Sequence, residues 1–291
     1  MSPFQADPSS LAASSATQLP GFLAGARVLI AEDNEVNLEV AKFHLENLGC
    51  ATTSAVNGAA ALDCARQAAF DFVLMDCQMP VMNGFEALTA IRQVDQNLKR
   101  QRTPIIAVTA ADDPDTQREC DAAGFDGFLA KPYSAEQLRS ALSRCLSQGS
   151  ADASAAARPD TPAQSGSHRS VDVATFRAFI DDFGIDAADM LLKPFVALLR
   201  ETAVRLDAAA ANDDMRALQA LSHKVAGASG TVGATGLSQQ ARKIEGLCKR
   251  GARVAATDIA DLRSLVTMAE ADFVRLLEPR AIADFINTAH S

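Results

Sequence analysis

A short apolar strand that ends in two acids, RVLIAED at residues 27–33, decides how the first half of this chain folds. Four more short apolar runs follow it, at residues 51–53, 72–75, 105–108 and 127–129. Segments with helical periodicity separate these runs, near residues 35–48, 57–68, 84–97, 115–123 and 134–147. Strands that alternate with helices form a parallel sheet covered on both faces. We therefore expect an α/β domain over residues 25–148, with a doubly wound parallel sheet of five strands.

The rest of the chain has a different character. Residues 149–170 are rich in Ala, Ser, Pro and Gly, which predicts a flexible linker. Beyond it the strand-like pattern stops, and long helical patterns break near Gly184, Asn212, Gly233 and Gly251. These features predict an all-α four-helix bundle over residues 171–280. We expect residues 1–24 to be a disordered N-terminal tail and residues 281–291 a C-terminal tail.

Composition excludes several classes of function. The net charge is −9 and no basic cluster is visible, so we expect no nucleic-acid binding. The six cysteines form no CxxC pair, which favours free thiols in a reducing compartment. The first 24 residues lack the pattern of a signal peptide, and no apolar run approaches the length of a membrane span. We expect a cytoplasmic protein that does not insert into a membrane.

Three carboxylates, one hydroxyl and one ammonium follow four different predicted strands; they belong to Glu32, Asp33, Asp76, Thr109 and Lys131. Ligands of open α/β sheets bind outside the carboxyl ends of the strands, so these groups should meet at one rim. Carboxylates that lie close together repel one another and favour a divalent cation, and Mg²⁺ prefers oxygen ligands. The set suits transfer of a phosphoryl group to a carboxylate, with Asp76 as the nucleophile.

These residues lie in four motifs that resemble the receiver domain of response regulators over residues 26–147. The motifs are LIAEDNEVN (29–37), VLMDCQMPVMNG (73–84), PIIAVTA (104–110) and GFLAKPY (127–133). The resemblance implies a flavodoxin-like fold, a bound Mg²⁺ and Asp76 as the phosphoacceptor. It also implies that Glu32 and Asp33 hold the metal, and that Thr109 and Lys131 contact the phosphoryl group.

The same resemblance implies three further features. The backbone carbonyl of Gln78 completes the metal shell, and the Lys131–Pro132 peptide bond is cis. Phe128 occupies the position of an aromatic residue that switches its orientation when Thr109 contacts phosphate. A plain core phenylalanine explains Phe128 equally well.

The segment 36–48 carries two apolar stripes when it is wound as a helix. One stripe should face the sheet; its members are Leu38, Ala41, Leu45 and Leu48. The other lies nearly opposite and contains Val36, Val40 and Phe43. A helix packed on one sheet does not need a second stripe, so we expect it to dock a partner helix that carries a histidine. Burial against another element or a dimer partner is the alternative. We expect His44, beside this stripe, to face solvent.

His223 stands out among the four histidines, whereas His168 and His290 lie in the predicted linker and tail. In ALSHKVAGASGTVGA (220–234), the predicted core stripe consists of Leu218, Leu221, Val225 and Val232. His223 points away from that stripe, on a face that includes Ala220, Ala226, Gly227 and Gly230. Glycine inside a helix is unfavourable by about 1 kcal/mol relative to alanine, so two on one face suggest a flat docking surface. A neutral imidazole is a competent nucleophile toward phosphorus near neutral pH.

The segments HKVAGASG (223–230) and GATGLSQQARKIE (233–245) resemble the histidine-containing phosphotransfer domain, over roughly residues 171–280. The resemblance implies that His223 is a phosphoacceptor. Ala226 departs from the family, which often has a lysine three residues after the histidine. Lys224 is turned about 100° away from His223, and Arg242 or Lys243 either compensates or is ordinary solvated surface.

Together the two halves predict a two-component phosphorelay protein. A sensor histidine kinase or phosphotransfer protein would phosphorylate Asp76, and His223 would carry a phosphoryl group to or from a receiver aspartate, such as that of a downstream response regulator. We expect no kinase activity, because the chain has no glycine-rich nucleotide-binding stretch outside the predicted bundle. One alternative is the C-terminal portion of a hybrid histidine kinase. Another is a binding module that keeps the receiver fold as a scaffold without phosphorylation.

Overall fold

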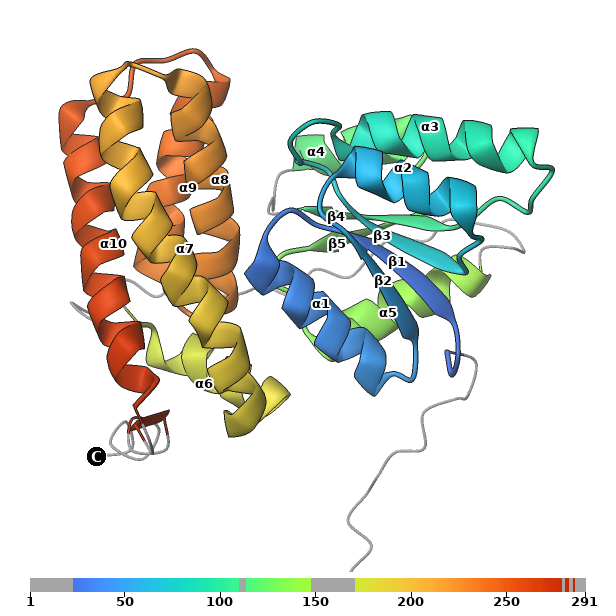
Figure 1. Ribbon diagram of the computed structural model, residues 1–291, viewed down its shortest axis with the longest axis horizontal. Helices are drawn as coiled ribbons and strands as arrows, with labels where there is room; N and C mark the ends of the chain where they lie inside the picture. Colours follow the sequence, from blue (N-terminus) through green and yellow to red (C-terminus); the bar gives the residue numbers. More distant parts are fainter. Residues whose placement is uncertain (1–22, 110–113, 148–170, 279–280, 283–284, 286–291) are drawn as a thin grey trace, which may run out of the picture.

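The computed structural model describes residues 23–109, 114–147, 171–278, 281–282 and 285. It shows an α/β half and a helical half that lie side by side (Figure 1). The α/β half consists of β1 (Arg27–Ala31), α1 (Glu35–Asn47), β2 (Ala51–Ala55), α2 (Gly58–Gln67), β3 (Phe72–Asp76), α3 (Gly84–Asn97), β4 (Ile105–Thr109), α4 (Pro114–Ala123), β5 (Gly127–Ala130) and α5 (Ala135–Ser147). Each predicted strand and helix is present, with ends that differ from the prediction by at most two residues.

The five strands form one parallel sheet in the order β2-β1-β3-β4-β5, as predicted. Successive side chains of a strand point to opposite faces, and both faces are apolar here. Val28 and Ile30 of β1 pack with α1 and α5, whereas Leu29 and Ala31 pack with α2 and α3. A sheet buried on both faces explains why its strands are continuous apolar runs rather than alternating ones.

The helical half consists of α6 (Val173–Phe183), α7 (Ile185–Ala211), α8 (Met215–Thr231), α9 (Thr235–Lys249) and α10 (Ala256–Leu276). Helices α7 to α10 run alongside one another as the predicted bundle, and α6 packs at one end of it (Figure 1). The helix ends coincide with the predicted breaks. Gly233, for example, has a φ of 80°, and a Cβ there would lie 2.7 Å from the backbone nitrogen of Phe176. This turn therefore needs glycine.

Several predictions fall outside the described residues. They concern residues 1–22, the linker at 149–170 with His168, and most of the C-terminal tail with His290. Within the described part, Leu23 and Ile282 are buried on the two halves. All six cysteines are free thiols. No helix in this part is both long and apolar enough to cross a membrane.

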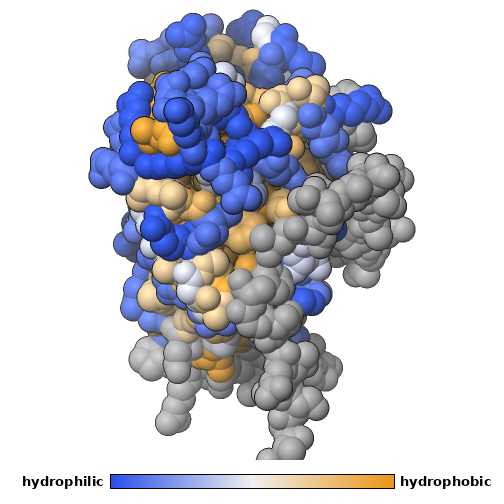
Figure 2. Space-filling view, turned by 90° about the vertical axis from the view of Figure 1, so that its right-hand side faces the viewer, coloured by the Kyte–Doolittle hydropathy of each residue, from blue (hydrophilic) through white to orange (hydrophobic). Residues whose placement is uncertain are grey.

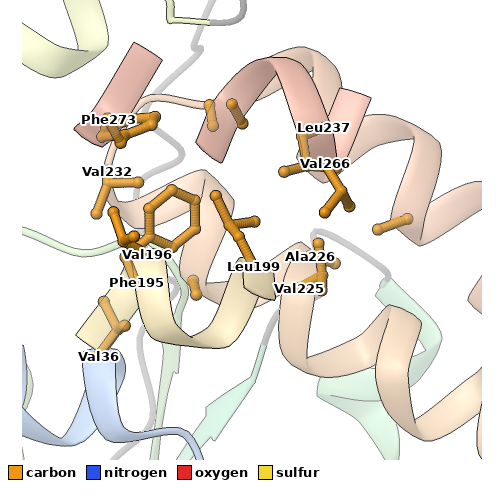
Figure 3. Close-up of a cluster of buried hydrophobic side chains, with 14 of the residues drawn as sticks. Val36, Phe195, Val196, Leu199, Val225, Ala226, Val232, Leu237, Val266 and Phe273 are labelled. Carbon is orange, nitrogen blue, oxygen red and sulfur yellow. The ribbon is translucent and has the colours of Figure 1, made fainter. Parts of the chain in front are cut away.

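Helix α1 lies between the sheet and the helical bundle (Figure 1). Its first stripe packs on the sheet, as predicted. Val36 and Val40 of its second stripe are only 1% and 4% exposed, because they join the apolar core of the bundle. Figure 3 shows Val36 beside Phe195 and Val196 of α7. The second stripe is thus covered by the helical half of the same chain. On the face turned away from the bundle, hydrophilic side chains dominate the upper part (Figure 2).

Candidate functional site

The acidic side chains meet at the carboxyl end of the sheet. Glu32 and Asp33 follow β1, Asp76 ends β3 and Lys131 follows β5. Carboxylate oxygens of the three acids lie within 4.8 Å of one another. The Lys131 ammonium lies 2.5 Å from Glu32 Oε2 and 2.6 Å from Asp76 Oδ2. The Lys131–Pro132 bond is cis, as predicted.

The charges at this rim shift one another's pKa values. Burial raises the pKa of Glu32 to about 7, and the carboxylates of Asp76 and Asp33 add to this effect although Lys131 opposes it. Burial alone would lower the pKa of Lys131, but the charges of Asp76 and Glu32 outweigh it and raise that pKa. Lys131 therefore stays protonated, and the three carboxylates still exceed its single charge. All-oxygen ligands with surplus negative charge are the environment that Mg²⁺ prefers.

The other predicted residues of this half surround the rim. Thr109 ends β4 and is 4% exposed, and its backbone carbonyl accepts a hydrogen bond from the Lys131 amide at 2.7 Å. The backbone N–H of Gln78 donates a hydrogen bond to Asp76 Oδ1 at 2.9 Å, which fixes the orientation of that carboxylate. Phe128 is half-buried on β5 against the core between the sheet and α2–α4.

His223 lies on α8, with its ring held by a carboxylate from α9. Its Nδ1 is 3.0 Å from Glu245 Oε1, and Lys249 lies 2.6 Å from the same oxygen. Burial alone would raise the pKa of Glu245, but His223 and Lys249 outweigh it and lower the pKa to about 2. Glu245 is therefore ionised near neutral pH. It accepts the Nδ1 proton of His223, which leaves the lone pair of a neutral imidazole on Nε2.

Burial also acts on His223, whose side chain is 17% exposed. Burial alone would lower the pKa of the imidazole. The hydrogen bond with Glu245 and the negative charge of Asp76 outweigh burial and raise that pKa above its ordinary value. The effect of Asp76 indicates that the two predicted phosphoacceptors are electrostatic neighbours.

A single small cavity joins the two sites. Its lining comes from both halves of the chain: Glu32, Asp33, Asn34, Asn37, Asp76, Lys131, His223, Lys224 and Gly227. Its volume is about 10 Å³, which is close to the space that one water molecule needs. The α/β half therefore closes over His223, and Asp76 and His223 face the same enclosed space.

The contact around this cavity is close and largely polar. Asn34, which caps the N-terminus of α1, donates its side-chain amide to the backbone carbonyl of Lys224 at 2.8 Å. The Lys224 ammonium lies 3.1 Å from Asp33 Oδ2. A Cβ at Gly227 would lie 3.1 Å from Asn37 Nδ2, so the Asn37 side chain would have to shift by a few tenths of an ångström to admit it.

The second glycine of the predicted flat face makes a looser contact. A Cβ at Gly230 would be 3.9 Å from Pro132 Cδ, which is ordinary van der Waals distance. The closest neighbour is the Ser238 hydroxyl of α9, 3.3 Å away. Gly230 thus lies at the edge of the surface that contains Gly227.

Two expectations about individual side chains, His44 and Ala226, were wrong. His44 does not face solvent but is 1% exposed, because α6 covers it. Ala226 is fully buried in the bundle core rather than lying on the open face beside His223. Lys224, which was expected to be turned about 100° away from His223, pairs with Asp33 of the other half. Lys243 pairs with Asp258 at 2.6 Å, which agrees with the solvated-surface interpretation.

Glu245 was missed by the sequence reasoning. It lies 22 residues after His223, inside a motif that had already been singled out. Two consecutive helices joined by a short turn run antiparallel, so an acid such as Glu245 on the second helix can lie opposite a histidine on the first. Which acid does so depends on the register of α8 against α9, which their packing sets.

Comparison with known proteins agrees with this geometry. Residues 28–143 match the family described as "Response regulator receiver domain", and residues 190–272 match the "Hpt domain" family. This chain contains two domains of the phosphorelay type. It joins a receiver domain to an Hpt domain.

The chain is similar to several curated proteins. One is the sensor protein GacS of Pseudomonas syringae pv. syringae, which is 30% identical over 254 residues, 84% of this chain and 27% of GacS. Another is the hybrid signal transduction protein dokA of Dictyostelium discoideum, 40% identical over 116 residues, 40% of this chain and 7% of dokA. The chain spans between 6% and 27% of the length of these and other curated relatives.

Solved structures also resemble the receiver domain. The receiver domain of the Arabidopsis thaliana histidine kinase CKI1, complexed with Mg²⁺ and BeF₃⁻, is 34% identical, with 44% of this chain and 94% of that chain covered and a TM-score of 0.40.

Proposed function

We propose that Asp76 and His223 are both phosphoacceptors, and that they exchange a phosphoryl group within one chain in the cytoplasm. The observation that carries this proposal is the enclosed cavity that both residues line. A sensor histidine kinase supplies the phosphoryl group to Asp76, and a downstream response regulator accepts it from His223.

In the first step a carboxylate oxygen of Asp76 attacks phosphorus, and the bond from phosphorus to the donor breaks. Lys131 and Thr109 contact the oxygens of the transferred group, while Phe128 is the candidate switch residue near Thr109. Glu32, Asp33, Asp76 and the backbone carbonyl of Gln78 would hold Mg²⁺. The ion would neutralise charge on the phosphoryl group.

In the second step the Nε2 lone pair of His223 attacks the phosphorus of the aspartyl phosphate. The bond between phosphorus and the Asp76 oxygen breaks, and the carboxylate is restored. The ring, which keeps its Nδ1 proton, then carries a positive charge that the ionised Glu245 stabilises. The reverse reaction uses the same groups.

The closed cavity adds a requirement. A space of about 10 Å³ has no room for a phosphoryl donor, so the two domains must move apart when Asp76 receives its phosphoryl group from outside. They close again when the group passes to His223. Alternation between a docked and an open arrangement of the two domains suits a phosphorelay, whereas a rigid arrangement would not.

The test uses the full chain with Mg²⁺ and acetyl phosphate, followed by mass spectrometry. We expect label on Asp76 and His223 of the wild type, on neither residue of Asp76→Asn, and on Asp76 alone in His223→Gln. Labelling of His223 at a rate independent of protein concentration would demonstrate transfer within one chain. Absence of label on Asp76 would refute the proposal and favour a scaffold, and label from ATP alone would indicate a kinase.

A second possibility is that these two domains act as part of a hybrid histidine kinase. The similarity to GacS favours it, because it spans 84% of this chain but 27% of that sensor protein. An immunoblot of the source cells tests it. A band near 30.6 kDa supports a separate relay protein, whereas a much larger band supports the hybrid kinase.

A further inference from the structure

Helix α6 makes a second contact with the receiver domain, away from the site of phosphoryl transfer. The ring centroid of Phe183 lies 5.0 Å from that of Phe43 and 4.7 Å from that of His44. Asp182 Oδ2 lies 3.8 Å from His44 Nε2. At 1.5 Å per residue along α1, this contact is about 13 Å from the start of the helix at the acidic rim.

Two observations separate this contact from the transfer machinery. Helix α6 (Val173–Phe183) precedes residue 190, where the match to the Hpt family begins. Its contact also differs in kind. Near His223 the contact is polar: the receiver domain meets the backbone carbonyl and the ammonium of Lys224, together with Gly227. At α6 it meets an aromatic ring and an acid, which depend on the side chains present.

The α6 side of the contact is held rigidly. Phe183 lies 4.9 Å from Phe179, and Phe179 lies 6.1 Å from Phe176, which is fully buried in the bundle. These contacts within α6 hold Phe183 from the bundle side, which reduces the side-chain ordering that docking requires. On the other side, His44 is enclosed by Phe183 and by Tyr133 of the receiver domain.

We infer that α6 is a selectivity element: Phe183 and Asp182, acting on Phe43 and His44, make the receiver domain prefer the Hpt domain of its own chain. The element does not touch the transferred group. It raises the occupancy of the closed state and excludes other chains from the docking face of α1. The inference rests on the proposed exchange between Asp76 and His223, but the contact is measurable without phosphorylation.

The first experiment measures docking alone, by hydrogen exchange of the α1 amides at residues 40–47 in the full chain. We expect Phe183→Ala to increase exchange there, with a smaller increase for Asp182→Ala. Asp181→Ala is the matched control, because that neighbouring acid is 72% exposed and pairs with Arg177 within α6. Unchanged protection in Phe183→Ala would refute the element.

The second experiment measures transfer between chains. A His223→Gln donor, labelled on Asp76 with radioactive acetyl phosphate, is mixed with an Asp76→Asn acceptor, and label on the acceptor histidine is followed. Aromatic pairs contribute about 0.5–1.5 kcal/mol, so Phe183→Ala in the donor should speed transfer between chains about two- to tenfold. Phe183→Ala in the acceptor is the converse variant: it leaves the donor's own docking intact and should not speed transfer between chains.

The results distinguish the two proposals. Looser docking with an unchanged rate between chains would refute the selectivity role. If no donor becomes labelled, or no acceptor histidine receives label, the proposed function fails, and hydrogen exchange still reports whether α6 holds α1. If the unmodified donor transfers between chains as fast as the wild type does within one chain, the selectivity role is refuted as well.

Discussion

Substitution of Glu245 by Gln tests how the Hpt domain prepares its histidine. The carboxylate lies 3.0 Å from His223 Nδ1, and its pKa of about 2 keeps it ionised at any working pH. A hydrogen bond to a charged group contributes roughly 1.5–3 kcal/mol, whereas a neutral one contributes about 0.5–1.5 kcal/mol. Glutamine keeps a hydrogen bond but loses about 1–1.5 kcal/mol where positive charge develops on the ring. We expect transfer from Asp76 to His223 to slow about tenfold at its plateau.

The pH dependence gives a second, independent readout. Only neutral imidazole attacks phosphorus, so the rate rises as pH passes the pKa of His223, which Glu245 holds above its ordinary value. Glu245→Gln removes that charge and lowers the pKa of His223, so the rise should move to lower pH. Single-turnover transfer from labelled Asp76, quenched at intervals between pH 5 and 9, measures both effects. A structural role alone predicts no shift of the midpoint.

A matched control separates this effect from the loss of any carboxylate. Glu270 pairs with Arg200 at 2.8 Å on the exposed side of the bundle, and Glu270→Gln should change neither plateau nor midpoint. The reasoning is refuted if Glu245→Gln gives the same plateau and midpoint as Glu270→Gln. Folding stability adds a check. Because the pKa of Glu245 is lowered from 4.5 to about 2, its stabilisation is present above pH 4.5 and is lost as pH falls toward 2. The Gln variant should lack this loss.

Three further predictions concern docking, acid and metal. Val40→Asp places a charge where the side chain is 4% exposed, so the two domains should undock. Hydrogen exchange should show the undocking, and the transfer rate within one chain should fall at least tenfold. Val56→Asp, at a 61% exposed position, should change neither. Burial lowers the pKa of His44 in the docked state, so the undocked state binds a proton on His44 more readily. Docking should therefore weaken as pH falls below about 6.5. Scattering measurements should show that the radius of gyration then increases, and His44→Asn should remove this increase. Chelation of Mg²⁺ or the Asp33→Asn change should abolish labelling of Asp76 by acetyl phosphate, and the fluorescence of Tyr133, in a chain without tryptophan, should lose its response to added Mg²⁺.

Helix α1 shows how far sequence reasoning extends. Helical periodicity correctly divided its apolar residues into two stripes, because the angle between successive side chains is fixed by the backbone. The sequence did not decide whether a partner helix, another element of the same chain or a dimer partner covers the second stripe. The structure places the chain's own bundle on Val36 and Val40, and His44 is buried as a consequence. Which surface covers a stripe depends on residues more than a hundred positions away.

The sequence by itself determined the fold of both halves and the convergence of Glu32, Asp76 and Lys131. Short apolar strands that alternate with helices form a parallel sheet with right-handed connections. In such a sheet the carboxyl ends of all strands lie at the same rim. Only the tertiary structure decided that Glu245 holds His223, that Lys224 reaches Asp33 and that one cavity joins Asp76 and His223. Those contacts depend on the register of α8 against α9 and on the fit of two surfaces. Both are set by side-chain packing across the whole molecule rather than by any local pattern.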